Sequence, residues 1–346
     1  MIAPFILALS VLPLGIAEAA CAQSIRKSWT DLTAAEKQSY IDADLCLMSA
    51  PPKAGIEGAT SRWDELQYAH AAQVRYIHSV GAFLPFHRFF VTVHDRLLRD
   101  ECGYTGPLPY WDEPTDAGDI TGSSVFTAEP NFGGNGTGNG GCVTDGPFAN
   151  LTLHFQRNLT TSDYCLSRSF SDRSFAASNS TNVEICLKKE TFVDVWNCME
   201  GAIHGAGHGG VGGTMLDLLL SPGDPVFFLH HGYMDRVWYQ WQAQNLTTRL
   251  TEIGGANTPR LNSSGGGFPG GGFPGGGFPG GGFPGGGFPG GFGFPDPNPA
   301  IENYLNDGGN VTTLNHTLWA AGILPNVTIG DVMDPTADFV CADYLL

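Results

Sequence analysis

Two groups of histidines constrain this chain more than any other feature of its sequence. Ten histidines occur among the 346 residues, and eight of them fall within the segments 70–94 and 204–231. Ordinary packing does not require imidazoles at this density, whereas several metal ions take neutral imidazole as a preferred ligand. The sequence therefore predicts a metal site whose ligands lie among His70, His78, His87, His94, His204, His208, His230 and His231.

The spacing of these histidines fits helices. His204 and His208 are four residues apart, so an α-helix places both side chains on one face. His70 and His78 are eight residues apart, a little over two helical turns, and they also share a side. We therefore expect each group to project its imidazoles from helices toward a common point.

Not every histidine in the chain is expected to bind metal. His230 and His231 are adjacent, and neighbouring side chains on a helix point in different directions, so we expect one to face the site and one not. Asp235 lies one turn after His231, where it is placed to accept the free ring N–H of a ligand. His154 and His316 lie outside both groups, and we interpret them as hydrogen-bonded core residues.

The donor set narrows the choice of metal. Six neutral imidazoles with no cysteine or carboxylate among them suit copper or zinc. A dizinc hydrolase would be expected to add bridging carboxylates as hard ligands. The acids near these histidines are instead candidates for orienting the ligand rings.

Helical patterning dominates the rest of the chain, which predicts a mainly α-helical fold. Thr33 and Glu36 form a capping-box pattern, and Pro85 suits a first helical turn. A Gly-, Asn-, Ser- and Thr-rich stretch, about 112–182, reads as long loop and contains two cysteines. We expect helices over about 29–43, 62–79, 85–100, 188–202 and 225–245.

Two motifs in a fixed order carry a family resemblance. The first is His70-x7-His78-x8-His87-Arg88-Phe89-Phe90, followed by Pro109-Tyr110-Trp111-Asp112. The second is His204-x3-His208, then Asp224-Pro225-Val226-Phe227-Phe228-Leu229-His230-His231-x3-Asp235-Arg236. Together they resemble the tyrosinase and catechol oxidase family of type-3 dicopper proteins over roughly residues 25–250, and the short secreted fungal type in particular.

The resemblance implies a fold and a ligand set. It implies a central four-helix bundle that holds two copper ions, with long disulfide-tied loops. In the family pattern the second histidine of the adjacent pair binds metal, so His230 and His94 are left out, and Phe227 packs on a ligand ring. The implied ligands are His70, His78 and His87 for the first copper and His204, His208 and His231 for the second.

The resemblance also implies a chemistry, in which the copper pair takes electrons from an ortho-diphenol, yields an ortho-quinone and reduces O2 to water. Glu200 matches the acid that holds a water near the second copper and is a candidate base. Efficient monophenol hydroxylases often carry an asparagine where this chain has Gly205, which favours diphenol oxidation. Leu218 matches the position that gates the second copper. A tyrosinase acting on monophenols and a non-catalytic O2-binding protein remain open alternatives.

The ends of the chain and its cysteines suggest export. Residues 1–19 hold a short apolar run ending in Ala17-Glu18-Ala19, which reads as a signal peptide before a single domain at 20–346. Eight cysteines and nine Asn-x-Ser/Thr sequons fit a secreted, extracellular glycoprotein with disulfides, although 105 pairings are possible. No cysteine lies between 47 and 101, so no cysteine close in sequence is available to form a thioether bond with His78. The repeat of Gly-Gly-Gly-Phe-Pro units in 265–295 is expected to be a disordered loop.

Charge limits the range of partners. The formal net charge of −17 argues against nucleic acid and against anionic membranes. No stretch after the signal peptide is apolar enough to cross a membrane. The family resemblance implies O2 and small phenolic substrates as partners, and the sequence does not identify a partner protein.

Overall fold

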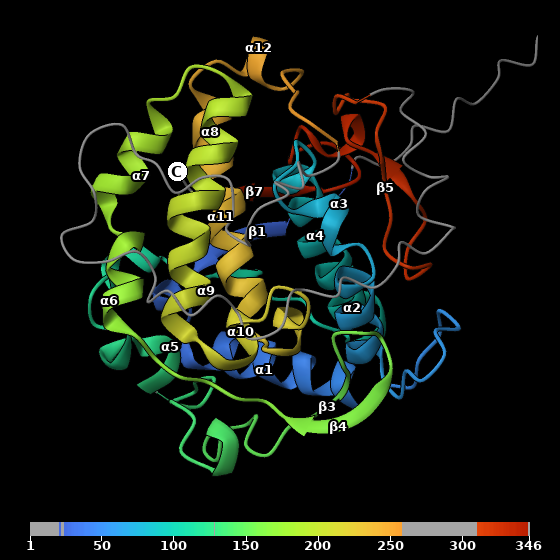
Figure 1. The fold of residues 1–346 in the computed structure, drawn as a ribbon, viewed down its shortest axis with the longest axis vertical. Coiled ribbons are helices and arrows are strands. Elements are labelled where there is room, and N and C mark those ends of the chain that lie inside the picture. The colour runs from blue at the N-terminus through green and yellow to red at the C-terminus, as the bar shows by residue number, and fades with distance from the viewer. Residues whose placement is uncertain (1–20, 22–23, 128, 258–309, 345–346) are drawn as a thin grey trace, which may run out of the picture.

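The computed structural model describes Cys21 and residues 24–127, 129–257 and 310–344 (Figure 1). Two predictions fall on other residues: the signal peptide at 1–19 and the disordered repeat at 265–295 lie outside the described parts of the chain. The prediction of a mainly α-helical protein is confirmed, since the strands in the described ranges are short and lie at the edges of the helical core.

Four helical segments form the central bundle. Figure 1 shows α8 and α9 arranged end to end beside α11, with α2 and α4 across from them, and α11 packs directly on α4. A short π-helical turn, η6, joins α8 to α9 and places a wider turn in the middle of this segment. The bounds are α2 Arg62–Ala71, α4 Phe83–Cys102, α8 Phe192–Met199, η6 Glu200–His204, α9 Gly205–Val211 and α11 Val226–Ala243.

Local sequence explains where the first helices begin. The predicted capping box is present, because the Glu36 backbone N–H donates to Thr33 Oγ1 and the Thr33 N–H donates to Glu36 Oε2. Helix α1 accordingly spans Ala34–Ser49, so it begins five residues later than predicted. A 3-10 turn, Trp29–Asp31, precedes it. A second capping box, between Ser61 and Asp64, begins α2.

The prediction of one continuous helix over 62–79 is wrong. Helix α2 ends at Ala71, and a single turn, α3 (Val74–Ile77), follows before His78 adopts an extended conformation. The side-chain amide of Gln73 donates to the Ala69 carbonyl at 2.6 Å. In a continuing helix this carbonyl would accept the backbone N–H of Gln73, so the side chain competes with the helical hydrogen bond. His70 and His78 therefore do not lie on one helix.

The stretch at 112–182 is more structured than predicted. It contains an antiparallel hairpin of β3 (Thr152–Phe155) and β4 (Thr161–Cys165) and runs into α7, which the sequence reading missed. Asn179 caps α7 by accepting from the Asn182 backbone N–H, a local signal within a polar run. The shorter helices are α5 Ser124–Thr127, α6 Asp172–Phe175, α7 Ser180–Leu187, α10 Gly213–Leu216 and α12 Leu246–Arg249.

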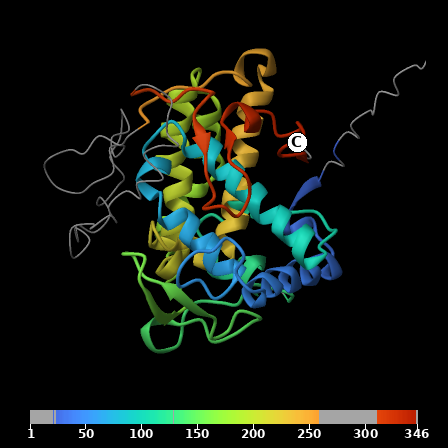
Figure 2. The ribbon, with the colours of Figure 1, turned by 90° about the vertical axis from the view of Figure 1, so that its right-hand side faces the viewer.

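Short strands join the two ends of the described chain. Strand β1 (Ser24–Ser28) pairs in parallel with β2 (Pro109–Tyr110) on one side and with β7 (Ala342–Tyr344) on the other. Strands β5 (Thr317–Leu318) and β6 (Val327–Thr328) form a separate antiparallel pair. Figure 2 shows the C-terminal segment lying across the outside of the helical bundle.

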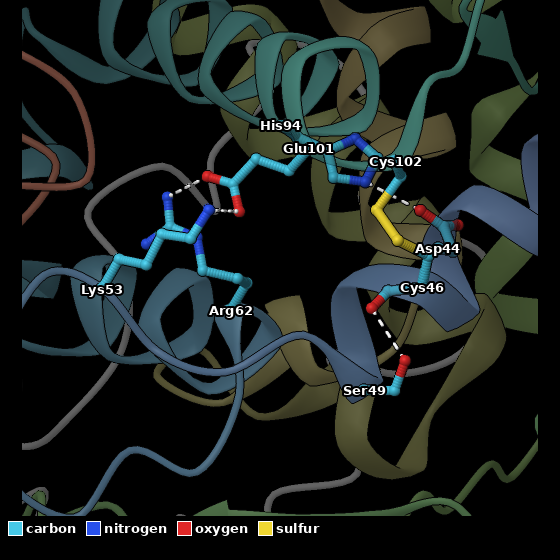
Figure 3. Close-up of a disulfide and its surroundings, with 8 residues drawn as sticks. All are labelled: Asp44, Cys46, Ser49, Lys53, Arg62, His94, Glu101 and Cys102. Carbon is cyan, nitrogen blue, oxygen red and sulfur yellow. Dashed lines mark hydrogen bonds and ion pairs between the residues drawn. A yellow bond between two sulfur atoms is a disulfide. The ribbon is translucent and has the colours of Figure 1, made fainter.

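All eight cysteines form disulfides, and the long loops are tied down as predicted. Figure 3 shows the Cys46–Cys102 bond, which joins α1 to the last turn of α4. Because Cys46 takes part in this disulfide, its sulfur is not available to bond a histidine. The pairs are Cys21–Cys341, Cys46–Cys102, Cys142–Cys165 and Cys186–Cys198.

One apolar core runs through the described residues, from Trp29 in the N-terminal segment to Tyr344 in β7. Buried aromatic side chains such as Trp63, Phe86 and Trp238 fill the spaces between the bundle helices. None of the helices in the described part of the chain has the length and apolar character that crossing a bilayer requires.

Candidate metal centre

The first three predicted ligands converge from three different elements. His70 lies in the last turn of α2, His78 follows α3, and His87 lies in the second turn of α4. Their ring centroids are 5.1 Å (His70 to His78), 5.6 Å (His70 to His87) and 5.1 Å (His78 to His87) apart. One nitrogen of each ring lies within 4.8 Å of the others, a spacing that a single metal ion can bridge.

The other three predicted ligands form a second triad. His204 ends the π-helical turn η6, His208 lies one turn later on α9, and His231 comes from α11. Their centroids are 4.4 Å (His204 to His208), 5.3 Å (His204 to His231) and 5.5 Å (His208 to His231) apart. The second cluster of close ring nitrogens contains these three residues and His230.

Main-chain carbonyls orient four of the six rings. Each of these rings directs Nδ1 at a backbone oxygen, and such a bond needs the proton on Nδ1. The Nε2 atom of each ring is then left with its lone pair free to coordinate. The bonds are His70 to Leu219 O (3.3 Å), His78 to Val74 O (3.1 Å), His87 to Phe83 O (2.8 Å) and His208 to Met215 O (2.6 Å).

The residues present fit a pair of copper ions. Burial lowers the pKa of His78 and of His208 to about 3, and it lowers the pKa of the other four rings well below the usual range, so all six stay neutral. Buried ring nitrogens with no hydrogen-bond partner are costly unless a ligand such as a metal ion meets them. Among the six proposed ligands, the Nε2 atoms in this condition are those of His70, His87, His204, His208 and His231, and the Nε2 of the neighbouring His230 is in the same condition.

Aromatic packing joins the two triads. The rings of His87 and His231 stack at 4.1 Å, although they belong to different triads. Phe227 lies at the position expected for an aromatic that packs on a ligand ring: its centroid is 4.2 Å from that of His231 and 5.4 Å from that of His70. On the other side, Phe83 lies 4.8 Å from His204. The two triads are therefore joined by contacts between aromatic rings.

His230 corrects one sequence expectation, because it does not point away from the centre. Its ring lies 4.7 Å from that of His208, and its Nδ1 forms a short hydrogen bond with the buried carboxyl group of Glu113. Helices α9 and α11 approach closely here, since a Cβ at Gly207 would lie 2.4 Å from the His230 ring. Gly207 therefore leaves room for the His230 ring beside the second triad. The sequence predicted that only one of the adjacent pair, His230 and His231, would face the site.

The remaining histidines lie away from both triads. His94 lies two helical turns after His87 on α4, where its Nε2 forms a hydrogen bond with Asp44 at 2.8 Å (Figure 3) and its ring stacks on Phe228 at 3.8 Å. His154 bonds Asp64 at 2.9 Å beside the β3–β4 hairpin. His316 is buried in the C-terminal segment. The structure therefore separates all three from the candidate metal centre.

Asp235 does not accept a hydrogen bond from a histidine, and that sequence prediction is wrong. Its Oδ2 accepts from Arg26 Nη1 at 2.6 Å and from the Tyr344 hydroxyl at 2.5 Å, while its Oδ1 accepts from Arg88 Nε. Two buried guanidinium groups compete for the carboxylate more strongly than a neutral imidazole does. Asp235 thus ties the strands at both ends of the described chain to α4 and α11.

Glu200 and Gly205 lie at the second triad. The Glu200 carboxylate accepts from the Ser79 backbone N–H at 2.7 Å and from the Trp196 indole N–H at 2.6 Å. Burial is the largest influence on this carboxyl group and raises its pKa to about 7. A Cβ on Gly205 would have only the Glu200 carbonyl oxygen near it, at 3.9 Å, so the space beside Gly205 is open.

Leu218 follows α10 in the chain. It is partly buried and packs with Ala71, Val74 and Leu219. The Leu219 carbonyl oxygen holds the ring of His70, so Leu218 lies one residue from a group that orients the first triad. Its gating of the second copper stays a prediction.

Sequence reasoning missed three residues that contact this site. Ser79 contributes a backbone N–H, which no side-chain pattern reveals. Glu113 lies far from His230 in sequence, and only the fold brings the two together. Trp196 is one helical turn before Glu200, and that spacing is the signal that could have found it.

Comparison with known proteins agrees with this geometry. The family model for the common central domain of tyrosinase matches residues 60–244. Tyrosinase ustQ of Aspergillus flavus is 33% identical over 255 residues, which cover 70% of each protein. The tyrosinase-like protein phomQ2 of Diaporthe leptostromiformis is 36% identical over 66% of this chain, and the match spans 61% of that relative's length.

The solved structures give the same result. A glycine-to-asparagine mutant of polyphenol oxidase from Thermothelomyces thermophila is 28% identical and superposes with a TM-score of 0.74, covering 94% of this chain and 89% of that one. The matched region contains both histidine triads. The chain therefore belongs to the tyrosinase family, the copper oxidoreductases whose members hold a type-3 pair of copper ions.

Proposed function

We propose that this protein is a secreted catechol oxidase. It would convert two ortho-diphenols to two ortho-quinones while one O2 takes up the four electrons and four protons released and becomes two waters. His70, His78 and His87 would hold one copper ion and His204, His208 and His231 the other. When bound, the copper pair supplies the redox chemistry, carrying electrons from the diphenol to O2.

The protein's own part is to keep its ligands neutral, exclude bulk water and move protons. Burial holds the six imidazoles in the neutral form in which their Nε2 atoms can coordinate at any pH near neutrality. Phe227 and Phe83 pack against these rings and keep the enclosure apolar. The Glu200 carboxylate would take the hydroxyl proton of the bound diphenol, for which a pKa of about 7 is well matched at neutral pH.

The pairing of Glu200 with Gly205 carries the preference for diphenols. A base is present, but Gly205 offers no polar side chain to orient a water beside it. A diphenol brings its own acidic hydroxyl groups, whereas a monophenol depends more on a positioned base for its first deprotonation. The open space at Gly205 also supports entry of substituted phenols.

The second candidate is a tyrosinase that also hydroxylates monophenols at the ortho position. The names of the relatives favour it, since ustQ is called a tyrosinase and phomQ2 tyrosinase-like. Both candidates use the same six histidines and Glu200, and they differ in whether a monophenol is deprotonated efficiently before oxygen transfer.

The deciding experiment is oxygen uptake by protein shown to contain two copper ions per chain. We expect rapid uptake with 4-methylcatechol and little with 4-methylphenol, its matched monophenol. Comparable uptake with both would establish the tyrosinase, and uptake with neither would point to an O2-binding protein without turnover. Glu200→Gln should lower the rate with 4-methylcatechol by about a hundredfold or more, the scale of a lost general base.

We also propose that the protein is secreted and glycosylated. Four disulfides in one chain favour an oxidising compartment. Seven sequon asparagines have exposed side chains and are open to modification: Asn135, Asn150, Asn158, Asn245, Asn310, Asn315 and Asn326. Mass spectrometry of protein from the medium of a eukaryotic host should find glycans on these residues and an N-terminus near residue 20. Retention of residues 1–19 in the product would contradict the signal peptide.

A further inference from the structure

Both oxygens of the Glu200 carboxylate are held by N–H donors, and the donors come from opposite halves of the site. Ser79 directly follows His78 of the first triad, and its backbone N–H donates to Oε1 at 2.7 Å. Trp196 lies on α8, which leads into the second triad, and its indole N–H donates to Oε2 at 2.6 Å. One carboxylate therefore links the elements that carry the two groups of histidines.

We propose that Trp196 is a positioning residue that fixes the orientation of the Glu200 carboxylate for proton transfer from the substrate, an inference that rests on the proposed function. An oxygen that accepts one N–H keeps a second lone pair, so both oxygens remain able to accept the substrate proton. Two donors at fixed points also prevent the carboxylate from rotating, which preserves the short approach that proton transfer requires.

The indole of Trp196 is itself held rigidly. Its side chain is buried, and its ring packs on that of Phe192 with centroids 6.4 Å apart. The edge of the ring faces Gly255, where a Cβ would lie 2.5 Å from Cζ3 and where the backbone φ of +89° favours glycine. The indole can neither swing away from Glu200 nor be displaced without moving this loop.

The same loop supports the second donor. Ser79 has a φ of +56°, an uncommon backbone conformation for a residue with a side chain, and its N–H donates to Glu200. Two residues later, the Gly81 N–H donates to the Ala256 carbonyl at 2.9 Å. The segment at 254–256 thus contacts both the loop that presents Ser79 and the ring of Trp196, so it holds the two donors at a fixed separation.

A purely structural role for Trp196 predicts different behaviour from a positioning role. The Trp196→Phe variant keeps an aromatic ring against Gly255 and removes the N–H donor. If the residue acts through Glu200, this variant should lower kcat for 4-methylcatechol by about tenfold, with KM changed less than about twofold. In a Glu200→Gln background, Trp196→Phe should lower kcat by less than about twofold, because the carboxylate that Trp196 positions is already absent.

Trp111 provides a matched control. Its indole N–H also donates to a carboxylate, Asp116 Oδ2 at 2.7 Å, in a buried site that does not contact Glu200. Trp111→Phe should change kcat for 4-methylcatechol by the same factor in the presence and absence of the Glu200→Gln substitution. All variants would be compared only after copper analysis confirms two ions per chain.

A second readout needs neither copper nor turnover. In metal-free protein with 15N-labelled tryptophan, Glu200→Gln should shift the indole N–H resonance of Trp196, assigned by its loss in Trp196→Phe, and leave that of Trp111 in place. An unshifted Trp196 resonance would overturn the proposal, as would equal losses from Trp196→Phe in both Glu200 backgrounds. If instead Glu200→Gln leaves the rate unchanged, the proposed base itself is wrong and this inference fails with it.

Discussion

The imidazole rings of His87 and His231 lie almost parallel, with an interplanar angle of 10° and centroids 4.1 Å apart. His87 belongs to the first triad and His231 to the second, so this stack is a direct contact between ligands proposed for different copper ions. Burial lowers the pKa of both rings, and the neighbouring His87 ring lowers the pKa of His231 further.

Replacement of His231 by alanine should reduce the copper content from two ions per chain to one. The second position would keep only two of its proposed ligands, and a two-imidazole site binds copper far more weakly than a three-imidazole site. Metal analysis after exhaustive dialysis measures the ratio. His154→Ala, which removes a histidine outside both triads, should retain two ions. Two tightly held ions in His231→Ala would contradict the assignment and point to His230.

The metal-free protein should lose stability as the pH falls below 6.5. Unfolded histidines bind protons with a pKa near 6.5, whereas burial lowers the pKa of His78, His208 and His230 to about 3. The unfolded state therefore takes up protons that the folded state refuses, and each such ring lowers the free energy of unfolding by up to about 1.4 kcal/mol per pH unit.

Glu113 and Glu200 have raised pKa values and act in the opposite direction, but the buried rings outnumber them. Urea denaturation of chelator-treated protein at pH 7.5 and pH 5.5 measures the net effect. Equal unfolding free energies at the two pH values would show that the rings are not held in a proton-excluding environment.

Glu200→Gln should stabilise the metal-free protein more at pH 8 than at pH 5. Burial raises the pKa of Glu200 to about 7 from its usual value of 4.5. Between these values the folded state binds a proton that the unfolded state has released, so the wild-type protein loses stability as the pH rises through this window. Glutamine does not titrate, so the difference between the two proteins should grow by up to about 3 kcal/mol. A difference that is independent of pH would contradict the raised pKa.

Asp235→Asn should destabilise the fold without removing copper. Asp235 is the carboxylate partner of the buried Arg26 and Arg88, and loss of one partner in a buried charge cluster costs about 3 kcal/mol or more. Chemical denaturation measures the loss, and metal analysis of the native protein should still find two ions. Glu184→Gln, which breaks an exposed pair with Lys188, should change the unfolding free energy by less than about 0.5 kcal/mol. Loss of copper in Asp235→Asn but not in Glu184→Gln would indicate that Asp235 does orient a metal ligand.

Gly205→Asn should raise the ratio of monophenol to diphenol activity. The backbone of Gly205 is helical, with φ −60° and ψ −31°, and a side chain there meets open space. An asparagine amide beside Glu200 would supply the second polar group for a water that assists deprotonation, worth about tenfold in the ratio of kcat/KM values. Oxygen uptake with 4-methylphenol and 4-methylcatechol measures the ratio. An unchanged ratio would show that Gly205 does not set the preference.

Residue spacing predicted most of the histidines at the metal centre but few of the residues that hold them in place. His204 and His208 share a helical face as four-residue spacing requires, and the capping box at Thr33 marks the start of α1. The break after α2 was not predictable from periodicity, because it depends on the side chain of Gln73 competing for a backbone carbonyl. Local patterns describe a helix, whereas such competition depends on the surroundings.

Long-range contacts limited the remaining predictions. Asp235 has the spacing of a residue that orients a ligand, but Arg26, which lies 209 residues away, takes its carboxylate. Glu113 reaches His230 only because α11 packs beside the segment that follows β2. Sequence separation of this size carries no signal in a single sequence, so these partners appear only once the chain is folded.

Most of the rings at the metal centre take their orientation from the peptide backbone. The acceptors for Nδ1 are the carbonyl oxygens of Val74, Phe83, Met215 and Leu219, and a carbonyl oxygen belongs to every amino acid. A point mutation at any of these four positions changes a side chain and leaves the acceptor in place. The ligand tautomers are thus buffered against mutation, so substrate preference is free to drift in evolution through positions such as Gly205 and Leu218 while the redox core stays intact.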